Sequence, residues 1–302
     1  KILIDEPPTF KNKLKSYLGD GLPFPKARAS ALFDYISENK LYDTSKETLL
    51  EILNSPNNIL GIEYIKSILK LNSNIKPYTI NRVNSGYNSL NINNSICSAS
   101  AIRNALKTDS LETINYTMPK PTYDLINDTV NSGVNLVYND DFYQILSSII
   151  LRDKDNLTDY FEVNEGIENK IYNSIFKCQN IEELQNEIKS KRYTMTKISR
   201  TLNNIMLGIK RDDILKTKDL KEMPYVRVLA FNDKGCEILK EIKKNSEIEV
   251  ITKFSKIKHI DSDIFNTLIN YDIKATNMYS LIYNKSLLKG PMDYITSPKY
   301  IK

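Results

Sequence analysis

The chain has 302 residues, enough for about two domains of ordinary size. Its hydrophobic fraction of 41% and charged fraction of 26% are typical of a globular protein and exclude a disordered or collagen-like chain. The single histidine excludes a multi-histidine metal site, and the net charge of +5 is a mild indication of an anionic partner. The cysteines are scattered and lack metal-ligand spacing, which favours the reducing cytoplasm. No apolar run is long enough to cross a membrane, so we expect no membrane-spanning segment.

Two amphipathic helices are predicted near the start of the chain. The first covers Thr9 to Leu18, directly after two prolines, and the second covers Lys26 to Glu38. The stretch 19–25 between them holds two glycines and two prolines, which end one helix and begin the next.

Residues 55–107 have the pattern of a fragment of an α/β domain. Ser55 and Pro56 are suited to the N-cap and first position of a helix that runs to about residue 71. A strand is predicted from Ile75 to Val83, a polar loop follows it, and another helix begins at Ser98. A complete doubly wound sheet needs further strands, so we expect a partial Rossmann-like domain.

The second half of the chain is predicted to be mainly helical. Residues 118–121, Met-Pro-Lys-Pro, form a candidate linker between a first domain, 1–117, and a second domain, 118–302. Helices are expected over 122–131, 140–152, 165–177, 181–190 and 194–210, and a strand–helix–strand unit over 226–253. The predicted fold class is therefore α/β plus α, with a small strand-containing part toward the C-terminus.

Ser98, Ser100 and Arg103 have the spacing of a phosphate site. Hydroxyl groups at a helix start, with a guanidinium one turn further on, suit a polyphosphate because free N–H groups and the helix dipole attract anions there. An ordinary serine N-cap with a surface arginine explains the same residues, and both interpretations stay open.

Asn57 and Arg82 are weaker candidates for nucleotide binding. Asn57 lies at a predicted helix start, where its amide suits a base edge, a ribose or a phosphate, and where it equally suits helix capping. Arg82 lies at the end of a predicted strand, the place where open α/β sheets bind ligands, although a surface arginine is an equal alternative.

A basic segment marks the second domain. Residues 189–221 hold ten Lys or Arg against three Asp, and the densest part runs from Lys191 to Arg200. Thr194 or Thr196 is suited to capping a helix there, which gathers the cations near its start. Such a cluster is typical of phosphate-backbone binding, with Tyr193 able to stack on a base. A solvated basic surface is the competing interpretation.

These residues together resemble a known family. Residues 96–103 resemble the second signature of the nucleotidyltransferase superfamily, which binds ATP phosphates. Together with the stretches 21–28, 55–64 and 191–200, they resemble the tRNA(Met) cytidine acetate ligase family. The stretches 162–168 and 272–275 are also similar to that family, and the matches keep the family's order from about residue 20 to residue 280.

The resemblance implies an ATP-dependent ligase that activates acetate as acetyl-adenylate, releases pyrophosphate and acetylates N4 of the wobble cytidine in elongator tRNA(Met). Mg²⁺ is expected only because ATP usually carries it. The resemblance also implies that 1–117 is the C-terminal portion of a nucleotidyltransferase domain that binds ATP, and that 118–302 is a mainly helical tRNA-binding domain. The ATP-binding residues implied are Asn57, Arg82, Ser98, Ser100 and Arg103. The tRNA-binding residues expected in the basic domain are Lys191, Arg192, Tyr193, Lys197 and Arg200.

The family's His-x-x-His signature is absent from these 302 residues, so no catalytic residue is assigned. We expect the chain by itself to be a truncated and inactive form of the ligase, because half of the groups that stabilise the adenylation transition state are missing. An RNA-binding module without catalysis is the alternative. A small-molecule adenylyltransferase is a third hypothesis, which the basic segment argues against.

Overall fold

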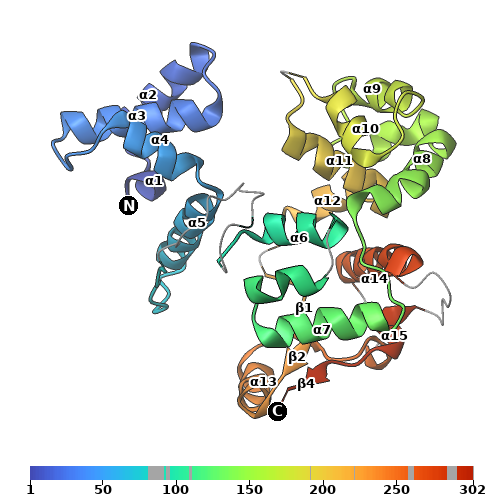
Figure 1. The fold of residues 1–302 in the computed structure, drawn as a ribbon. Coiled ribbons are helices and arrows are strands. Elements are labelled where there is room, and N and C mark those ends of the chain that lie inside the picture. Colours follow the sequence, from blue (N-terminus) through green and yellow to red (C-terminus); the bar gives the residue numbers. More distant parts are fainter. Residues whose placement is uncertain are drawn as a thin grey trace. The chain divides into compact units, whose positions relative to one another are not determined.

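The computed structural model describes residues 1–80, 92, 96–108, 111–190, 192–220, 222–257, 262–283 and 291–301. The chain forms two compact units, Lys1–Tyr87 and Asn88–Lys302 (Figure 1). The predicted boundary between the domains 1–117 and 118–302 stays a prediction. No helix in the described ranges is long and apolar enough to span a bilayer.

The first unit is helical in its described part. Its elements are α1 (Ile2–Asp5), α2 (Pro8–Gly19), α3 (Phe24–Glu38), α4 (Lys46–Asn54) and α5 (Pro56–Lys70). Both predicted helices near the start are confirmed as α2 and α3, and prolines occupy the first turn of each. Helix α3 packs between α2 and α4, and Phe10, Leu32 and Leu53 are buried in the small core that results.

Helix α5 begins at Pro56 with Ser55 as its N-cap, as predicted. The strand predicted from Ile75 is wrong over its described part, because residues 75–80 form no strand. A strand needs a neighbour to pair with its backbone N–H and C=O groups, and residues 75–80 have no such neighbour in the described structure. Ile80 is accordingly 97% exposed.

The second unit begins with a layer of short helices. These are α6 (Ala99–Thr108), the 3₁₀ helix η1 (Leu111–Thr117) and α7 (Lys120–Asn131). Ala101 and Ala105 lie one turn apart on the buried side of α6, and Ile114 and Thr117 of η1 are buried as well. Both α6 and α7 pack against η1, so the buried stripe fixes which face of α6 stays exposed.

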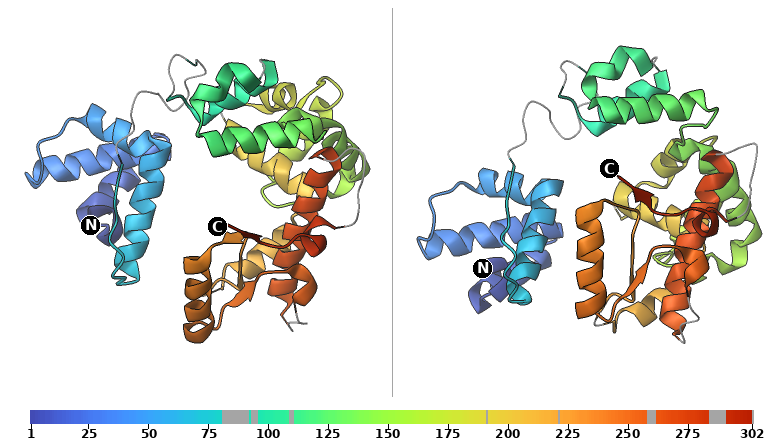
Figure 2. Two further views of the ribbon diagram at one scale, coloured as in Figure 1. Left: turned by 60° about the horizontal axis from the view of Figure 1, so that its bottom comes forward. Right: turned by 90° about the horizontal axis from the view of Figure 1, so that it is seen from below.

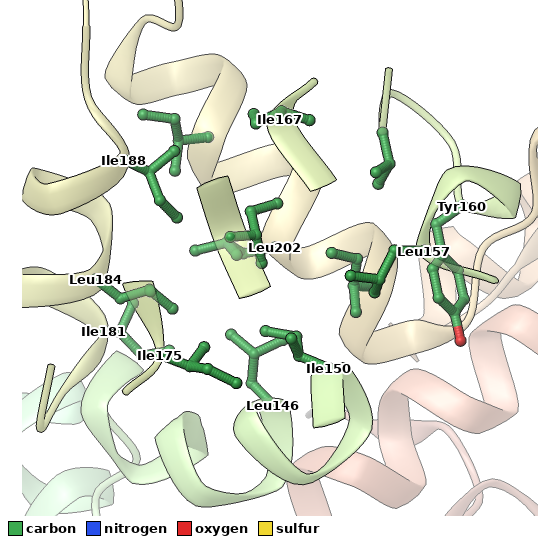
Figure 3. Packing of buried hydrophobic residues seen from close by; sticks show 14 of the residues in the cluster. Leu146, Ile150, Leu157, Tyr160, Ile167, Ile175, Ile181, Leu184, Ile188 and Leu202 are labelled. Carbon is green, nitrogen blue, oxygen red and sulfur yellow. The ribbon is translucent and has the colours of Figure 1, made fainter. Parts of the chain in front are cut away.

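The largest core of the second unit joins four helices. They are α8 (Tyr143–Arg152), α9 (Ile167–Ser174), α10 (Ile181–Ile188) and α11 (Met195–Leu207), with η2 (Asn139–Phe142) and η3 (Lys154–Asp159) beside them. Ile167, Ile171 and Ile175 are buried at the predicted four-residue spacing. Leu146 and Ile150 point from α8 toward Leu202 of α11 (Figure 3). This core fixes the start of α11, where the basic segment lies.

The C-terminal part contains the described strands. Its elements are α12 (Arg211–Thr217), β1 (Tyr225–Arg227), β2 (Ala230–Phe231), α13 (Asp233–Asn245), β3 (Glu249–Ile251), η4 (Phe254–Lys256), α14 (Asp263–Tyr283), α15 (Met292–Ile295) and β4 (Lys299–Tyr300). The predicted strand–helix–strand unit is confirmed by β1, α13 and β3. Strand β1 pairs with β3 and β2 pairs with β4, both in parallel. Figure 2 shows α13 beside these strands.

Candidate nucleotide and nucleic-acid interfaces

Ser98 caps helix α6. The backbone N–H of Ala101 donates a hydrogen bond to Ser98 Oγ at 3.0 Å, and Ser98 is 3% exposed. This is the N-cap geometry that the sequence predicts, in which the side chain satisfies one of the free N–H groups of the first turn. The cap therefore accounts for the position of Ser98 without a ligand, and the serine fixes where the helix starts.

The exposed side of α6 carries the other two candidate residues. Ser100 is half-buried in the first turn, and Arg103 is exposed three residues further on. A separation of three residues places both on one helix face, away from the buried Ala101 and Ala105. The helix start and an exposed guanidinium thus share one side, which is an arrangement suited to an anionic group.

Lys107 extends the cationic side of α6. It lies four residues after Arg103, and its Nζ stands 4.8 Å from the ring centroid of Tyr138. No ion pair is formed by Arg103 with any residue that the structure describes. The described part of α6 thus offers a positive face with one unpaired guanidinium.

Asn57 belongs to the first compact unit, and Arg82 lies outside the described residues. Asn57 is exposed at the second position of α5, and Ser55 makes no side-chain cap hydrogen bond there. The structure thus gathers Ser98, Ser100 and Arg103 at one helix start. It describes Asn57 within a separate unit.

The basic segment leads into α11. Thr194 is the N-cap of this helix, since Lys197 N donates a hydrogen bond to its Oγ1 at 3.3 Å. The cap confirms one of the two predicted alternatives. Arg192 and Arg200 are exposed, and Lys197 is half-buried. Lys191 lies outside the described residues.

Two glutamates from an earlier loop pair with these cations. Arg200 makes a two-point contact with Glu162, with Nε–Oε2 and Nη2–Oε1 distances of 3.0 and 2.9 Å. A carboxylate oxygen of Glu165 lies 3.5 Å from Arg192 Nε and 3.7 Å from Lys197 Nζ. The contact with Glu162 raises the pKa of Arg200, which keeps its guanidinium charged. The positive charge of the segment is therefore partly compensated within the protein.

Both glutamates adopt backbone conformations that are unusual for residues other than glycine. The φ angles of Glu162 and Glu165 are 64° and 61°, and Gly166 follows with a φ of 88°. Such left-handed residues persist where the surrounding contacts hold them in place. The loop thereby carries both carboxylates to the start of α11, although Glu162 precedes Arg200 by 38 residues.

Tyr193 does not have the exposed ring that stacking on a base requires. It is 6% exposed, and its hydroxyl donates a hydrogen bond to the carbonyl oxygen of Glu165 at 2.6 Å. Arg192 and Lys197 lie on its ring at 5.8 and 5.6 Å from the centroid. The structure makes Tyr193 part of the core, where it holds the glutamate loop against α11.

The carboxylate of Asp153, near the same core, accepts hydrogen bonds from Arg152 and from a second tyrosine, Tyr160. Arg152 donates two hydrogen bonds to Asp153, and the Tyr160 hydroxyl donates one more. These bonds lower the pKa of Asp153 to about 2, with Arg152 as the largest cause. Burial and the bond to Asp153 raise the pKa of Tyr160 to about 12. Both pKa shifts indicate a structural role for this hydrogen-bonded group, since neither Asp153 nor Tyr160 titrates near neutral pH.

No group of three or more His, Cys, Asp and Glu residues suited to a metal ion occurs within the described ranges. The described side chains therefore supply no protein-borne metal site of that kind.

Comparison with known proteins assigns the chain to a family. The family described as HIGH Nucleotidyl Transferase matches residues 1–291 of the chain. The tRNA(Met) cytidine acetate ligase of Clostridium perfringens is 44% identical over 299 residues, which make up 99% of this chain and 70% of that protein. The chain belongs to the tRNA(Met) cytidine acetate ligase family. A relative of the same name from Clostridium acetobutylicum is 45% identical over 296 residues, covering 97% of this chain and 69% of the relative.

Two solved structures of Thermotoga maritima TmcAL share the fold. The apo structure, form I, has a TM-score of 0.86 at 28% identity and covers 99% of this chain and 72% of its own chain. The structure bound with alpha-thio ATP, form II, has a TM-score of 0.83 at 28% identity, with coverages of 99% and 71%. The predicted α/β plus α fold class and the family resemblance are both confirmed.

Proposed function

We propose that the chain is part of an ATP-dependent ligase that acetylates N4 of the wobble cytidine in elongator tRNA(Met). One observation carries this proposal. The chain matches, over 99% of its length and at 44% identity, a relative named tRNA(Met) cytidine acetate ligase. The TmcAL structure bound with alpha-thio ATP supports ATP as the nucleotide. We assign the reaction to the cytoplasm, where tRNA is modified in bacteria.

The proposed reaction has two balanced steps. A carboxylate oxygen of acetate attacks the α-phosphate of ATP, which forms acetyl-adenylate and releases pyrophosphate. The N4 amine of cytidine then attacks the acetyl carbonyl carbon, AMP leaves, and N4 loses a proton. Mg²⁺ would offset the charge of the polyphosphate in the first step.

The α6 start is our proposed contact for the phosphates of ATP. Arg103 is exposed, carries a planar fork of donors and has no ion pair in the described structure. Ser100 lies on the same face, and Ser98 fixes the first turn through its cap. By the family resemblance we also assign Asn57 and Arg82 to ATP binding. We give these five residues binding roles and no role in moving protons.

The start of α11 is our proposed contact for the tRNA backbone. Lys197 and Arg200 lie in the first two turns of α11, Arg192 precedes its N-cap, and Lys191 adds a fourth cation in the sequence. Phosphate contacts of this kind supply affinity without reading sequence. Tyr193 is left out of this surface because it is buried.

The histidine pair of the family is not among these 302 residues, which contain only His259. We therefore propose that this chain alone binds substrates without forming acetyl-adenylate. The test is acetate-dependent exchange of labelled pyrophosphate into ATP, measured for this chain and for a chain that also includes the family's His-x-x-His segment. We expect exchange only in the longer chain.

The alternative function is RNA binding without catalysis, which the basic segment alone would support. The same experiment separates the two, when tRNA binding is measured alongside. A longer chain that binds tRNA but shows no acetate-dependent exchange would overturn the ligase and leave the binding module. Exchange without tRNA binding would overturn the role of the α11 segment.

A further inference from the structure

A small pocket lies among the strands at the C-terminal end of the second unit. It has a volume of about 70 Å³, and residues from the end of β1, the end of β3 and the segment before β4 line it. Pockets that enclose whole small molecules measure roughly 300–1,000 Å³. The pocket is therefore of a size for one polar group of a larger ligand.

The strand pairing explains why a pocket opens here. Val228 N donates to Ile251 O at 2.9 Å, so the chain after β1 still follows β3. One residue later, Lys299 N donates to Leu229 O at 3.0 Å, so the chain now follows β4. The segment 225–231 thus changes its parallel partner between residues 228 and 229. In open parallel sheets, ligands bind outside the carboxyl ends of strands, and the carboxyl ends of β1 and β3 border this pocket.

Arg227 is held in a fixed orientation in this pocket. Its Nη2 donates to Oδ1 of Asp293, and its guanidinium carbon lies 4.6 Å from the ring centroid of Phe254. The side chain of Asp293 is 2% exposed, whereas that of Arg227 is 30% exposed. Among the described residues, Arg227 donates no other hydrogen bond. The guanidinium is thus already positioned and still has free donors, which lowers the entropic cost of binding.

The surroundings of Arg227 are positive. Lys253 lines the same pocket, and no residue in the described structure forms an ion pair with it. The segments that border the pocket also carry Lys256 and Lys299, and Asp293 is the one acid that lines it. The buried Oδ2 of Asp293 has no donor in the described part, so that carboxylate depends on Arg227 for compensation.

We infer that this pocket binds a backbone phosphate of the tRNA, on Arg227 and Lys253. Asp293 is a positioning residue that orients the guanidinium. Thr252 and Ser297 also line the pocket, and hydroxyl groups of serine and threonine are common donors to phosphate oxygens. This inference rests on the proposed function for its source of phosphate. It adds a second contact region, separate in sequence from the start of α11.

A structural tie between β1 and α15 is the competing role for the Arg227–Asp293 pair. Such a tie needs no free donors on Arg227 and no cation at residue 253. Lys253→Gln therefore carries the test, since that side chain has no partner to lose and the fold is expected to persist. Arg227→Gln combined with Asp293→Asn is the second variant, which avoids leaving a buried charge unpaired.

The experiment measures binding of deacylated tRNA to the full chain from 50 to 200 mM NaCl. For Lys253→Gln we expect affinity to fall roughly 3- to 10-fold and the salt slope to shrink by about 1. The double variant should weaken binding further. Lys240→Gln, which removes an exposed charge from α13, is the matched control and should leave the slope unchanged.

The outcomes separate this inference from the proposed function. Wild-type chain that fails to bind tRNA overturns the proposed tRNA role itself. Wild-type binding with equal affinity and slope in Lys253→Gln overturns the pocket alone. A parallel titration with pyrophosphate distinguishes the source: pyrophosphate binding that Lys253→Gln abolishes, with tRNA binding intact, would overturn the assignment to the tRNA backbone.

Discussion

The carboxylate of Glu165 and the cations of the basic segment have opposite effects on tRNA binding. Glu165 lies between Arg192 and Lys197, at 3.5 and 3.7 Å from their nitrogen atoms. A phosphate that approaches either cation must compete with this carboxylate and is repelled by it. We therefore predict that Glu165→Gln makes the chain bind tRNA more tightly.

The size of the effect follows from exposure. The side chains of Arg192, Lys197 and Glu165 are 62%, 25% and 51% exposed, so the Arg192–Glu165 pair is open to solvent and the Lys197–Glu165 pair is partly open to it. Exposed pairs of this kind contribute about 0–1 kcal/mol each. Loss of the two ion pairs that Glu165 makes corresponds to roughly 2- to 10-fold tighter tRNA binding. Stability should fall by less than about 1 kcal/mol.

The assay is tRNA binding to wild type and Glu165→Gln at several salt concentrations. The gain should be largest at low salt, because screening weakens the carboxylate's repulsion. Glu187→Gln is the control, since Glu187 pairs with Lys177 outside the basic segment. Unchanged or weaker binding by Glu165→Gln would refute the idea that these cations meet tRNA.

Other substitutions test the nucleotide contact, the core and the acid-sensitive tie. In a chain that includes the family's His-x-x-His segment, Arg103→Ala should lower acetate-dependent pyrophosphate exchange by about 10-fold or more, and Arg103→Lys should restore part of it. Leu184→Ala should lower the free energy of unfolding in urea by about 2–5 kcal/mol, because Leu184 is 0% exposed, whereas Leu151→Ala, 48% exposed, should change it by less than about 0.5. The lowered pKa of Asp153 contributes stability that is present above about pH 4 and lost as the pH falls toward 2. Tyr160→Phe removes one cause of that shift, so urea unfolding should depend less on pH in this window.

Local patterns in the sequence were sufficient for most helices. Pro56 after Ser55 marked the start of α5, and the spacing of Ile167, Ile171 and Ile175 marked a buried face. Helix α14 was not predicted, although it has 21 residues. Its apolar residues are spread around the helix, with few of them buried, so periodicity gives a weak indication there.

The candidate sites depended on contacts that are distant in sequence. The acids within 189–221 were few, yet Glu162 and Glu165 approach from an earlier loop, and a count along the chain does not include them. Tyr193 is an aromatic residue within a basic segment, which predicted stacking on a base. Its side chain is instead buried in the four-helix core, which no local pattern shows. The pocket at Arg227 needed the exchange of strand partners between β1 and β2, which no local pattern encodes.

The ligase proposal is tested most directly by mass spectrometry of nucleosides. Unmodified elongator tRNA(Met) is incubated with isotope-labelled acetate, ATP and a chain that includes the family's His-x-x-His segment, and is then digested. We predict labelled N4-acetylcytidine that forms only when ATP and acetate are both present, and that is missing when these 302 residues are used alone. Failure of the longer chain to produce labelled N4-acetylcytidine would contradict the proposed function.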